Sequence, residues 1–347
     1  MSSDRFIGAF VFPEVWRDLA GFRELLAALR GYGVNALLTE SETYSEAVIA
    51  AAHDQGLRFY AGLSCFSDHA ADFRRLDSRP ELWPILGTGE RRPRMEWYIG
   101  LIPTDRAQQQ AVLSAVGTVA RDYPIDGLFL DFVRWPLHWE IELRPGRPRP
   151  LDSSFDAQTM RMFQTATGID LSSDLGSAKK VADRIRARHL QEWVDFKCRV
   201  ISGFVAEARD ILKATRPHAE LGVFMVPDVD GKSEGLTGQR MADLAPLADW
   251  LSPMLYHNIL LRPPGWIGPE VSKVVRVAGR KTLPVLQADS NRDPASTADW
   301  GPPMSTGDWR LTLAEVASRT DVAGVIVFPG TSLIGNGRGE LLGEMIK

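Results

Sequence analysis

Residues Ile125–Pro136 read IDGLFLDFVRWP, and this stretch decides how the rest of the chain is interpreted. Asp126 and Gly127 form a turn signal, and the apolar run after them has strand propensity. The run stops at Asp131, where a buried strand would reach the surface. Pro136 ends any ladder of hydrogen bonds because it has no N–H. The stretch therefore predicts a strand buried on both faces that presents a carboxylate at its end.

The residues at this strand end suit the chemistry of sugar cleavage. The Asp131 carboxylate can act on an anomeric carbon, Arg134 can orient it, and the Trp135 indole offers a flat apolar face to a pyranose ring. The plainer alternative is that Asp131 only caps the next turn and that Arg134 pairs with it. The stretch alone leaves both interpretations open.

Composition limits the class of protein. The chain has 347 residues, 44% of them hydrophobic and 24% charged, as in soluble globular proteins. The formal net charge is −4 and no Lys/Arg tract stands out, so nucleic acid is not expected as the main partner. No run approaches the ~18 apolar residues of a membrane span. The start enters a strand at once, which predicts a cytoplasmic protein, or a secreted or periplasmic one if a leader has been removed.

Eight apolar segments with strand character alternate with helical stripes. Such near-continuous runs are typical of parallel strands buried on both faces. The predicted strands are Phe6–Phe12, Val34–Glu40, Leu57–Phe66, Leu128–Leu130, Glu220–Pro227, Asp249–His257, Thr282–Asp289 and Gly324–Phe328. The count predicts an α/β fold: a single (β/α)8 TIM barrel over residues 1–347, with long insertions after strands 3 and 4 at 67–104 and 137–180. A doubly wound open sheet would usually carry a Gly-rich turn after its first strand, where this chain has PEVWRD.

Two further structural expectations concern helices and cysteines. Apolar residues at helical spacing predict one long helix from about Val181 to Thr215. Cys65 and Cys198 match no metal-ligand spacing, and we expect two buried thiols rather than a disulfide.

Polar residues gather at the predicted strand ends, where barrel enzymes place their chemistry. Like charges around one barrel mouth raise some carboxyl pKa values, so one protonated acid can stand beside one carboxylate. Glycoside hydrolysis needs such a pair. The residues at the strand ends are Glu40, Asp131, Asp228, Asp230, Tyr256, His257, Asn258 and Asp289.

Six tryptophans fall on predicted loops of the barrel mouth. Each of them either packs a loop onto the barrel or stacks against a sugar, and as a set they favour sugar stacking. They are Trp97, Trp135, Trp139, Trp266, Trp300 and Trp309.

Several segments resemble one known family. DGLFLDFVRWP resembles the DG-hydrophobic-LD-hydrophobic-R-aromatic-P signature of bacterial glycoside-hydrolase-like TIM barrels distantly related to the alpha-amylase superfamily. RPELWPILGTGERRPRMEWYIGLIPT resembles their third-loop segment, FQTATGIDL a piece after their fourth strand, and DWLSPMLYH their sixth-strand segment. The resemblance runs over residues 6–333 and is most specific in the fourth and sixth strands.

The resemblance implies a barrel that takes carbohydrate, with Asp131 as nucleophile or transition-state stabiliser. The acid/base of amylase-like barrels is usually a Glu near the end of strand five. This chain departs from that pattern, because it has Asp228 there with Asp230 close by. It also lacks, in DSSFDAQTMRMF, the cysteines often found before the following helix.

The resulting hypothesis is a glycoside hydrolase or transglycosylase that acts on an oligosaccharide or polysaccharide without cofactor or metal. Asp131 and Asp228 are its predicted catalytic pair. A separation of ~5–5.5 Å between the two carboxyl groups predicts retention of the anomeric configuration, and ~6.5–9.5 Å predicts inversion. The predicted substrate-binding residues are Glu40, Trp97, Arg134, Trp135, Tyr256, His257, Asn258 and Asp289.

Three alternatives stay open. A non-catalytic carbohydrate-binding barrel would keep the tryptophans and need no acid pair. A metal-dependent hydrolase is disfavoured because the six histidines form no HxH or HExxH pair. A phosphate-binding barrel would use the Gly-rich FPGTSLIGNGRGE after strand eight, although a flexible turn into a last helix from about Arg338 is the simpler explanation of that segment.

Arginines are frequent in both long insertions. They fit recognition of an acidic sugar, or they are ordinary solvated loop charge. They are Arg91, Arg92, Arg94, Arg144, Arg147 and Arg149.

Overall fold

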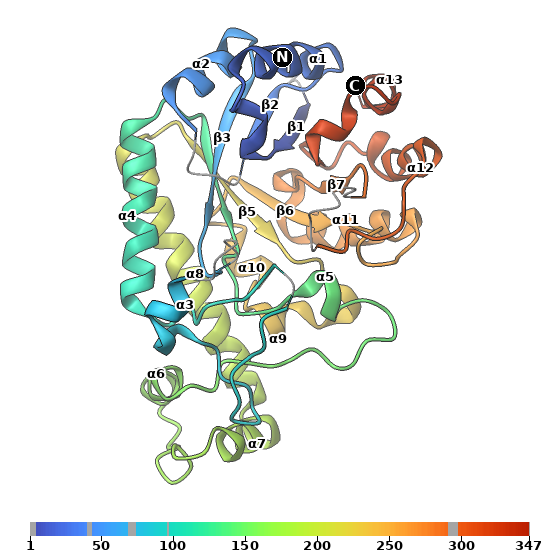
Figure 1. Ribbon diagram of the computed structural model, residues 1–347. Helices are drawn as coiled ribbons and strands as arrows, with labels where there is room; N and C mark the ends of the chain where they lie inside the picture. Colours follow the sequence, from blue (N-terminus) through green and yellow to red (C-terminus); the bar gives the residue numbers. More distant parts are fainter. Residues whose placement is uncertain (1–4, 40–43, 69–73, 96, 291–297, 347) are drawn as a thin grey trace.

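Eight parallel strands close into a barrel in the order β1 to β8, which confirms the expected (β/α)8 fold (Figure 1). This computed structural model describes residues 5–39, 44–68, 74–95, 97–290 and 298–346. The ring closes where β1 pairs with β8, with Phe6 opposite Gly324. The strands are β1 (Phe6–Val11), β2 (Ala36–Thr39), β3 (Arg58–Ser64), β4 (Gly127–Asp131), β5 (Glu220–Met225), β6 (Trp250–Leu255), β7 (Val285–Gln287) and β8 (Gly324–Phe328).

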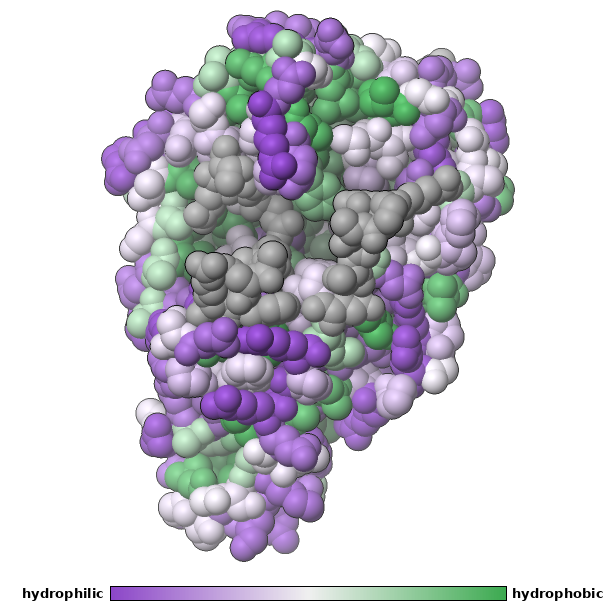
Figure 2. All heavy atoms as spheres, viewed as in Figure 1, coloured by the Kyte–Doolittle hydropathy of each residue, from purple (hydrophilic) through white to green (hydrophobic). Residues whose placement is uncertain are grey.

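Helices surround the strands, and α4 and α8 pack side by side along one flank of the barrel (Figure 1). Figure 2 shows hydrophilic side chains around the periphery of the same face. The α-helices are α1 (Leu19–Gly31), α2 (Glu46–Asp54), α3 (Arg74–Ser78), α4 (Arg106–Asp122), α5 (Trp139–Glu142), α6 (Ala157–Thr167), α7 (Ala178–Arg188), α8 (Leu190–Thr215), α9 (Ser233–Thr237), α10 (Met241–Leu244), α11 (Ile267–Ala278), α12 (Thr306–Ala317) and α13 (Arg338–Met345).

Side-chain caps set where several helices begin. Asp18, Ser45, Asp105 and Asp156 each accept a hydrogen bond from a backbone N–H in the first turn of the helix that follows. Ser305 caps α12 in a reciprocal capping box. Each cap satisfies an N–H that the helix itself cannot pair, and its loss costs about 1 kcal/mol.

The strands bury both faces, as their continuous apolar sequences predict. Alternate residues such as Phe10, Phe129 and Phe224 form one apolar cluster inside the barrel. Their neighbours, for example Val11, pack outward in a second cluster with the helices. Gly222 is required because a Cβ there would overlap the ring of Phe129. Apolar side chains, many of them aromatic, therefore fill the interior of the barrel.

The predicted long helix at 181–215 is wrong, because the chain forms two helices there. His189, between α7 and α8, has φ −137° and ψ 29°, so the chain changes direction at this residue. Each helix buries its own apolar stripe. No Gly or Pro marks the break, and the two stripes read as one in the sequence.

The two insertions are held in place at the barrel mouth by buried contacts. Residues of the first form a small apolar cluster that includes Leu82 and Ile102. In the second, the buried Glu142 carboxylate accepts hydrogen bonds from backbone N–H groups of His138 at 2.7 Å and Leu151 at 2.8 Å. It also accepts one from the guanidinium of Arg92, in the first insertion. One carboxylate therefore joins both insertions.

The structure also shows the state of the two cysteines and the character of the helices. Cys65 and Cys198 are buried free thiols, as expected. Among the described residues, no helix has the length and apolar character needed to cross a membrane.

Candidate active site

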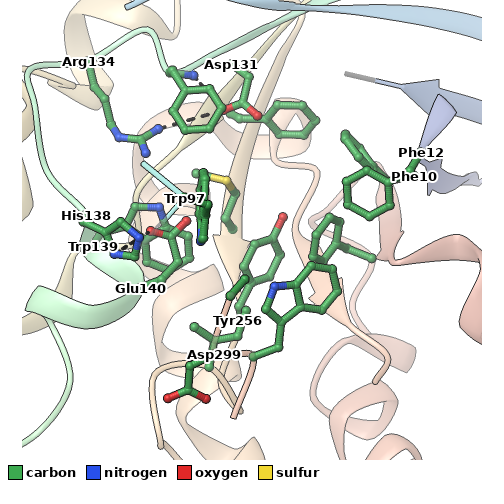
Figure 3. A pocket seen from close by; sticks show the side chains of 17 residues that line it. Phe10, Phe12, Trp97, Asp131, Arg134, His138, Trp139, Glu140, Tyr256 and Asp299 are labelled. Carbon is green, nitrogen blue, oxygen red and sulfur yellow. Dashed lines mark hydrogen bonds and ion pairs between the residues drawn. The ribbon is translucent and has the colours of Figure 1, made fainter. Parts of the chain in front are cut away.

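A cavity of about 220 Å³ opens at the carboxyl ends of the strands (Figure 3). Its wall combines strand ends with the loops that follow β3, β4 and β7. The lining residues are Phe10, Phe12, Trp97, Asp131, Phe132, Arg134, His138, Trp139, Glu140, Phe224, Met254, Tyr256, Ile259, Ala298, Asp299, Trp300 and Phe328.

Asp131 is the last residue of β4, and its carboxylate stands in the cavity wall. The next residue, Phe132, has φ 49°, a left-handed conformation that a bulky side chain rarely adopts. Its N–H donates to Oδ1 of Asp131 at 2.6 Å, and Nη1 of Arg134 lies 3.9 Å from the same oxygen. Asp131 therefore accepts a hydrogen bond from the following turn and pairs with Arg134, as the plainer alternative expects. It also lines the cavity.

Glu140 is the second carboxyl group of the cavity, in the first turn of α5. Its Oε2 is buried and has no hydrogen-bond partner among the described residues. Burial raises the pKa of Glu140 to about 7, the charge of Asp131 acts in the same direction, and the Arg134 cation opposes them. Near neutral pH this carboxyl group holds a proton about half of the time.

His138 stands beside Glu140, with Nδ1 4.0 Å from Oε2 of the carboxyl group. The ring is buried and packs against the aromatic rings of Trp97 and Tyr98, at centroid distances of 5.2 and 5.4 Å. Burial, and then the positive charge of Arg134, lower the pKa of His138 to about 3. The imidazole is therefore neutral at pH 7 and forms no ion pair with Glu140.

Several buried polar atoms of the cavity wall lack hydrogen-bond partners within the part of the chain that the structure describes. They are Nε and Nη1 of Arg134, both ring nitrogens of His138, Nε1 of Trp139 and Oε2 of Glu140. A buried donor or acceptor without a partner costs about 1–3 kcal/mol. Such atoms concentrated around one cavity indicate a place where a polar ligand completes the hydrogen bonds.

The opposite wall is aromatic. Figure 3 shows Arg134, His138 and Glu140 on one side of the cavity and Phe10 and Phe12 on the other. Nearby, Phe328 stacks on Tyr256 at 4.7 Å and contacts Trp300 at 5.0 Å between ring centroids. Apolar faces combined with a few fixed polar groups are typical of a ligand site, and aromatic faces suit the C–H faces of a sugar.

The structure brings Asp131, Arg134, Trp97 and Tyr256 together around this cavity, as the sequence predicts. Asp228 is not among the residues that line it. Asp228 lines a separate groove, where its Oδ1 accepts a hydrogen bond from the Ser233 N–H at 3.2 Å.

Other predicted substrate-binding residues lie outside the cavity wall. Trp135 is fully buried and donates from Nε1 to the Lys197 carbonyl at 3.1 Å, so the face expected to stack on sugar is covered. His257 is also buried. Asp289 forms an ion pair with Arg338 at 3.0 Å. Glu40 lies outside the described residues.

Asn258 does not line the cavity, but it contacts the loop that carries Trp300. Its amide donates to the carbonyl of Pro302 at 2.7 Å and to that of Trp300 at 3.2 Å. Trp300, with Trp97 and Trp139, lines the cavity. The other tryptophans of the predicted mouth set are not in the wall; one of them, Trp309, is buried and donates to the Arg338 carbonyl at 3.1 Å.

The sequence interpretation missed three polar residues of the cavity: His138, Glu140 and Asp299. The first two lie within ten residues of Asp131, in the segment LHWE, which was assigned only to a long insertion. The signal in the sequence is a carboxyl residue, Glu140, next to Trp139 and shortly after the strand that ends at Asp131. The pattern of the similar family instead predicts the acid near the end of strand five, at Asp228.

Metal and phosphate sites were also alternatives. Within the described ranges, no three His, Cys, Asp or Glu side chains gather in a way that would hold a metal ion. The Gly-rich segment after β8 leads into α13, which begins at Arg338 as the plainer interpretation predicts.

No family model and no curated protein matches the sequence. Among solved structures, the chain is similar to the glycoside hydrolase domain of PgaB (BpsB) from Bordetella bronchiseptica, with a TM-score of 0.72 and 16% identity over 99% of each chain. It also resembles the catalytic domain of beta-amylase from Paenibacillus polymyxa, with a TM-score of 0.65 and 11% identity over 100% of this chain and 98% of the other. A beta-galactosidase from Marinomonas ef1 matches with a TM-score of 0.64 and 13% identity, over 93% of this chain and 54% of the other. At these identities the likeness shows the fold: a TIM barrel of the kind found in glycoside hydrolases.

Proposed function

We propose that this protein hydrolyses or transfers glycosidic bonds of an oligosaccharide or polysaccharide, with Asp131 and Glu140 as its carboxyl pair. Three carboxyl groups line the aromatic cavity, and one of them, Asp299, is held in an ion pair with Arg144. The observation that carries the proposal is that the other two, Asp131 and Glu140, stand in different environments. Glycoside hydrolysis requires one acid that holds a proton and one carboxylate that does not. The expected kinship with the alpha-amylase superfamily stays a prediction from the sequence motif.

Glu140 is proposed as the general acid. Its pKa of about 7 leaves it largely protonated in mildly acidic solution, so it can donate a proton to the leaving glycosidic oxygen. Because its neighbour His138 is neutral, no adjacent imidazolium favours loss of that proton. These features support Glu140 rather than Asp228 in this role.

Asp131 is proposed to act on the anomeric carbon, either as nucleophile or by activating water. The Phe132 N–H and the Arg134 guanidinium stabilise its charged form. The donors on Arg134, His138 and Trp139 can bind sugar hydroxyls. Trp97 and Trp300 are available to stack on the ring.

Three variants test the assignment: Asp131→Asn, Glu140→Gln and Asp228→Asn. We expect the first two to lower turnover of an oligosaccharide by at least about 100-fold, within the range for general acid–base catalysis, and the third to leave it near wild type. Reducing ends released from a panel of oligosaccharides measure turnover, and NMR of the first product shows whether the anomer is retained.

A second substrate separates the two roles. An aryl glycoside with a good leaving group needs little protonation, so Glu140→Gln should retain far more activity on it than on an oligosaccharide. Asp131→Asn should be defective on both. Equal turnover in the wild type and in Asp131→Asn would refute the proposal. Saccharide binding without any hydrolysis would instead favour the non-catalytic carbohydrate-binding barrel.

A further inference from the structure

A large groove lies beside the cavity and is not used by the proposed mechanism. Its volume is about 1370 Å³, and it runs between the loop at 142–152, the start of α8, the segment at 225–242 and the end of α11. We call it the basic groove. The short helix α5 separates it from the cavity, because Glu140 lines the cavity and Glu142 lines the groove.

The basic groove is positively charged in a protein that is negative as a whole. Nine Lys and Arg side chains line it against five Asp and Glu side chains, whereas the net charge of the chain is −4. Four of the acids are in ion pairs: Glu142 with Arg92, Asp152 with Lys197 at 3.8 Å, Asp230 with Lys232 at 4.0 Å and Glu234 with Arg240 at 2.8 Å. Two more of the cations are paired, Arg144 with Asp299 at 2.5 Å and Lys273 with Glu270 at 2.7 Å. The positive charge available to a ligand is therefore that of the remaining arginines, Arg147, Arg149, Arg262 and Arg276.

Three arginines of the groove are exposed, and their side chains take no part in the hydrogen bonds or ion pairs of the described residues. They are Arg147, Arg149 and Arg276. A fourth, Arg262, has a buried Nε that also lacks a hydrogen-bond partner there. These guanidinium groups present planar donors suited to carboxylate or sulfate oxygens.

Arg144 links the wall of the groove to the wall of the cavity. Arg144, which lines the groove, donates from Nη1 to Oδ2 of Asp299 at 2.5 Å and from Nε to the Ile259 carbonyl at 2.7 Å. Asp299 and Ile259 both line the cavity. The charge of Arg144, together with that of Arg147, helps to lower the pKa of Asp299. The groove and the cavity therefore meet at this contact, and a saccharide chain long enough to pass Asp299 would reach the groove.

We propose that the basic groove binds an anionic stretch of the saccharide whose bond is cleaved in the cavity. The inference rests on the proposed function, and it names the substrate class as an acidic oligosaccharide or polysaccharide bearing carboxylate or sulfate groups. Exposed apolar side chains in the groove, Leu190 and Val277, can contact the C–H faces of the sugars.

The lining of the groove favours an acidic saccharide over a single-stranded nucleic acid. Proteins that bind single strands stack the bases on exposed aromatic side chains. The groove contains one aromatic residue among its described lining, Trp193, and this side chain is 1% exposed. The groove therefore offers charge without an aromatic platform on which bases could stack, which favours a saccharide over a single strand.

Calorimetry on Asp131→Asn, which prevents cleavage, tests the proposal with oligosaccharides of equal length. One is neutral, one carries uronic-acid carboxylates and one carries sulfate esters. We expect at least one acidic ligand to bind about tenfold more tightly than the neutral one, with an affinity that falls as salt screens the charges. The two acidic ligands identify the anionic group.

A triple groove variant adds three substitutions to Asp131→Asn: Arg147→Gln, Arg149→Gln and Arg276→Gln. It should bind the acidic oligosaccharide about tenfold more weakly than Asp131→Asn, because three cation contacts are lost. The matched control neutralises three exposed arginines that do not line the groove, Arg17, Arg30 and Arg310, and should bind as before. Equal losses in both triple variants would overturn the proposal. So would tighter binding of oligothymidylate than of either acidic saccharide.

Turnover by the otherwise wild-type chain separates this inference from the proposed function. Suppose that the protein hydrolyses a neutral oligosaccharide, and that the triple groove variant binds every oligosaccharide as tightly as Asp131→Asn does. This result would overturn the inference about the groove and leave the proposed hydrolase function intact. Acidic ligands that bind through the groove arginines but are never cleaved would overturn the hydrolase proposal and leave the groove as an acidic-saccharide site.

Discussion

Nδ1 of His138 lies 4.0 Å from Oε2 of Glu140, and both atoms are buried without a hydrogen-bond partner among the described residues. Because the pKa of His138 is lowered to about 3, this neighbour is neutral when Glu140, with a pKa of about 7, begins to ionise. The histidine thus adds no positive charge that would release the proton of Glu140. The pair keeps a proton donor in the cavity at neutral pH.

Activity should fall as pH rises through about 7. The pKa of Glu140 is raised to about 7, so the protonated form needed for general acid catalysis is present below that pH and lost above it. The pH profile of kcat/KM for an oligosaccharide measures this, and the alkaline limb should disappear in the residual activity of Glu140→Gln. A wild-type profile that stays flat to pH 9 would contradict the assignment.

Arg134→Gln should move that alkaline limb to higher pH. The positive charge of Arg134 opposes the raised pKa of Glu140, so its removal raises this pKa further. Arg134→Lys keeps the charge and should leave the limb near its wild-type position. Because Arg134 is buried, thermal unfolding of both variants is the control for folding. A limb that does not move in Arg134→Gln would show that this charge does not act on the titrating acid.

Glu142→Gln should destabilise the fold by about 3 kcal/mol, because the buried Arg92 loses its charged partner. Urea unfolding measures the loss. The matched variant is Glu140→Gln two residues away, which should cost much less stability because Glu140 already favours its neutral form. Equal destabilisation by the two substitutions would contradict the anchoring role of Glu142.

Trp300→Ala should raise KM about tenfold with a smaller effect on kcat, if the indole stacks on the sugar in the ground state and in the transition state alike. Trp266→Ala is the control, since Trp266 does not line the cavity. Kinetics on an oligosaccharide measure the split. A loss confined to kcat would assign Trp300 to the reacting geometry instead.

The fold should lose stability between pH 6.5 and about 4, in part through His257. Burial lowers the pKa of His257 to about 4, so below pH 6.5 the unfolded chain binds a proton that the folded chain does not. The loss approaches about 1.4 kcal/mol per pH unit for this residue. Urea unfolding at pH 7.5 and 5 should show a smaller difference for His257→Asn than for the wild type. Glu140, whose pKa is raised, instead stabilises the fold as pH falls through about 7. This contribution is the same in the wild type and in His257→Asn, so it cancels when the two proteins are compared.

The sequence by itself determined the eight strands and the position of Asp131 at the end of one of them. Continuous apolar runs specify strands buried on both faces, and parallel closure then brings their carboxyl ends to one mouth. That is why Asp131 and Tyr256, distant in the chain, could be expected in one cavity. Helix continuity was predicted less well, because His189 interrupts α7 and α8 without a local breaking residue.

Only the tertiary structure decided which acid accompanies Asp131 and which tryptophans face the cavity. Glu140 lies there because the Glu142–Arg92 contact anchors its loop across the mouth, and that contact joins residues 50 positions apart. Trp135 is buried while Trp300 lines the cavity, although both follow predicted strands. Burial and pKa depend on how distant loops pack together, and a local residue pattern carries no record of that packing.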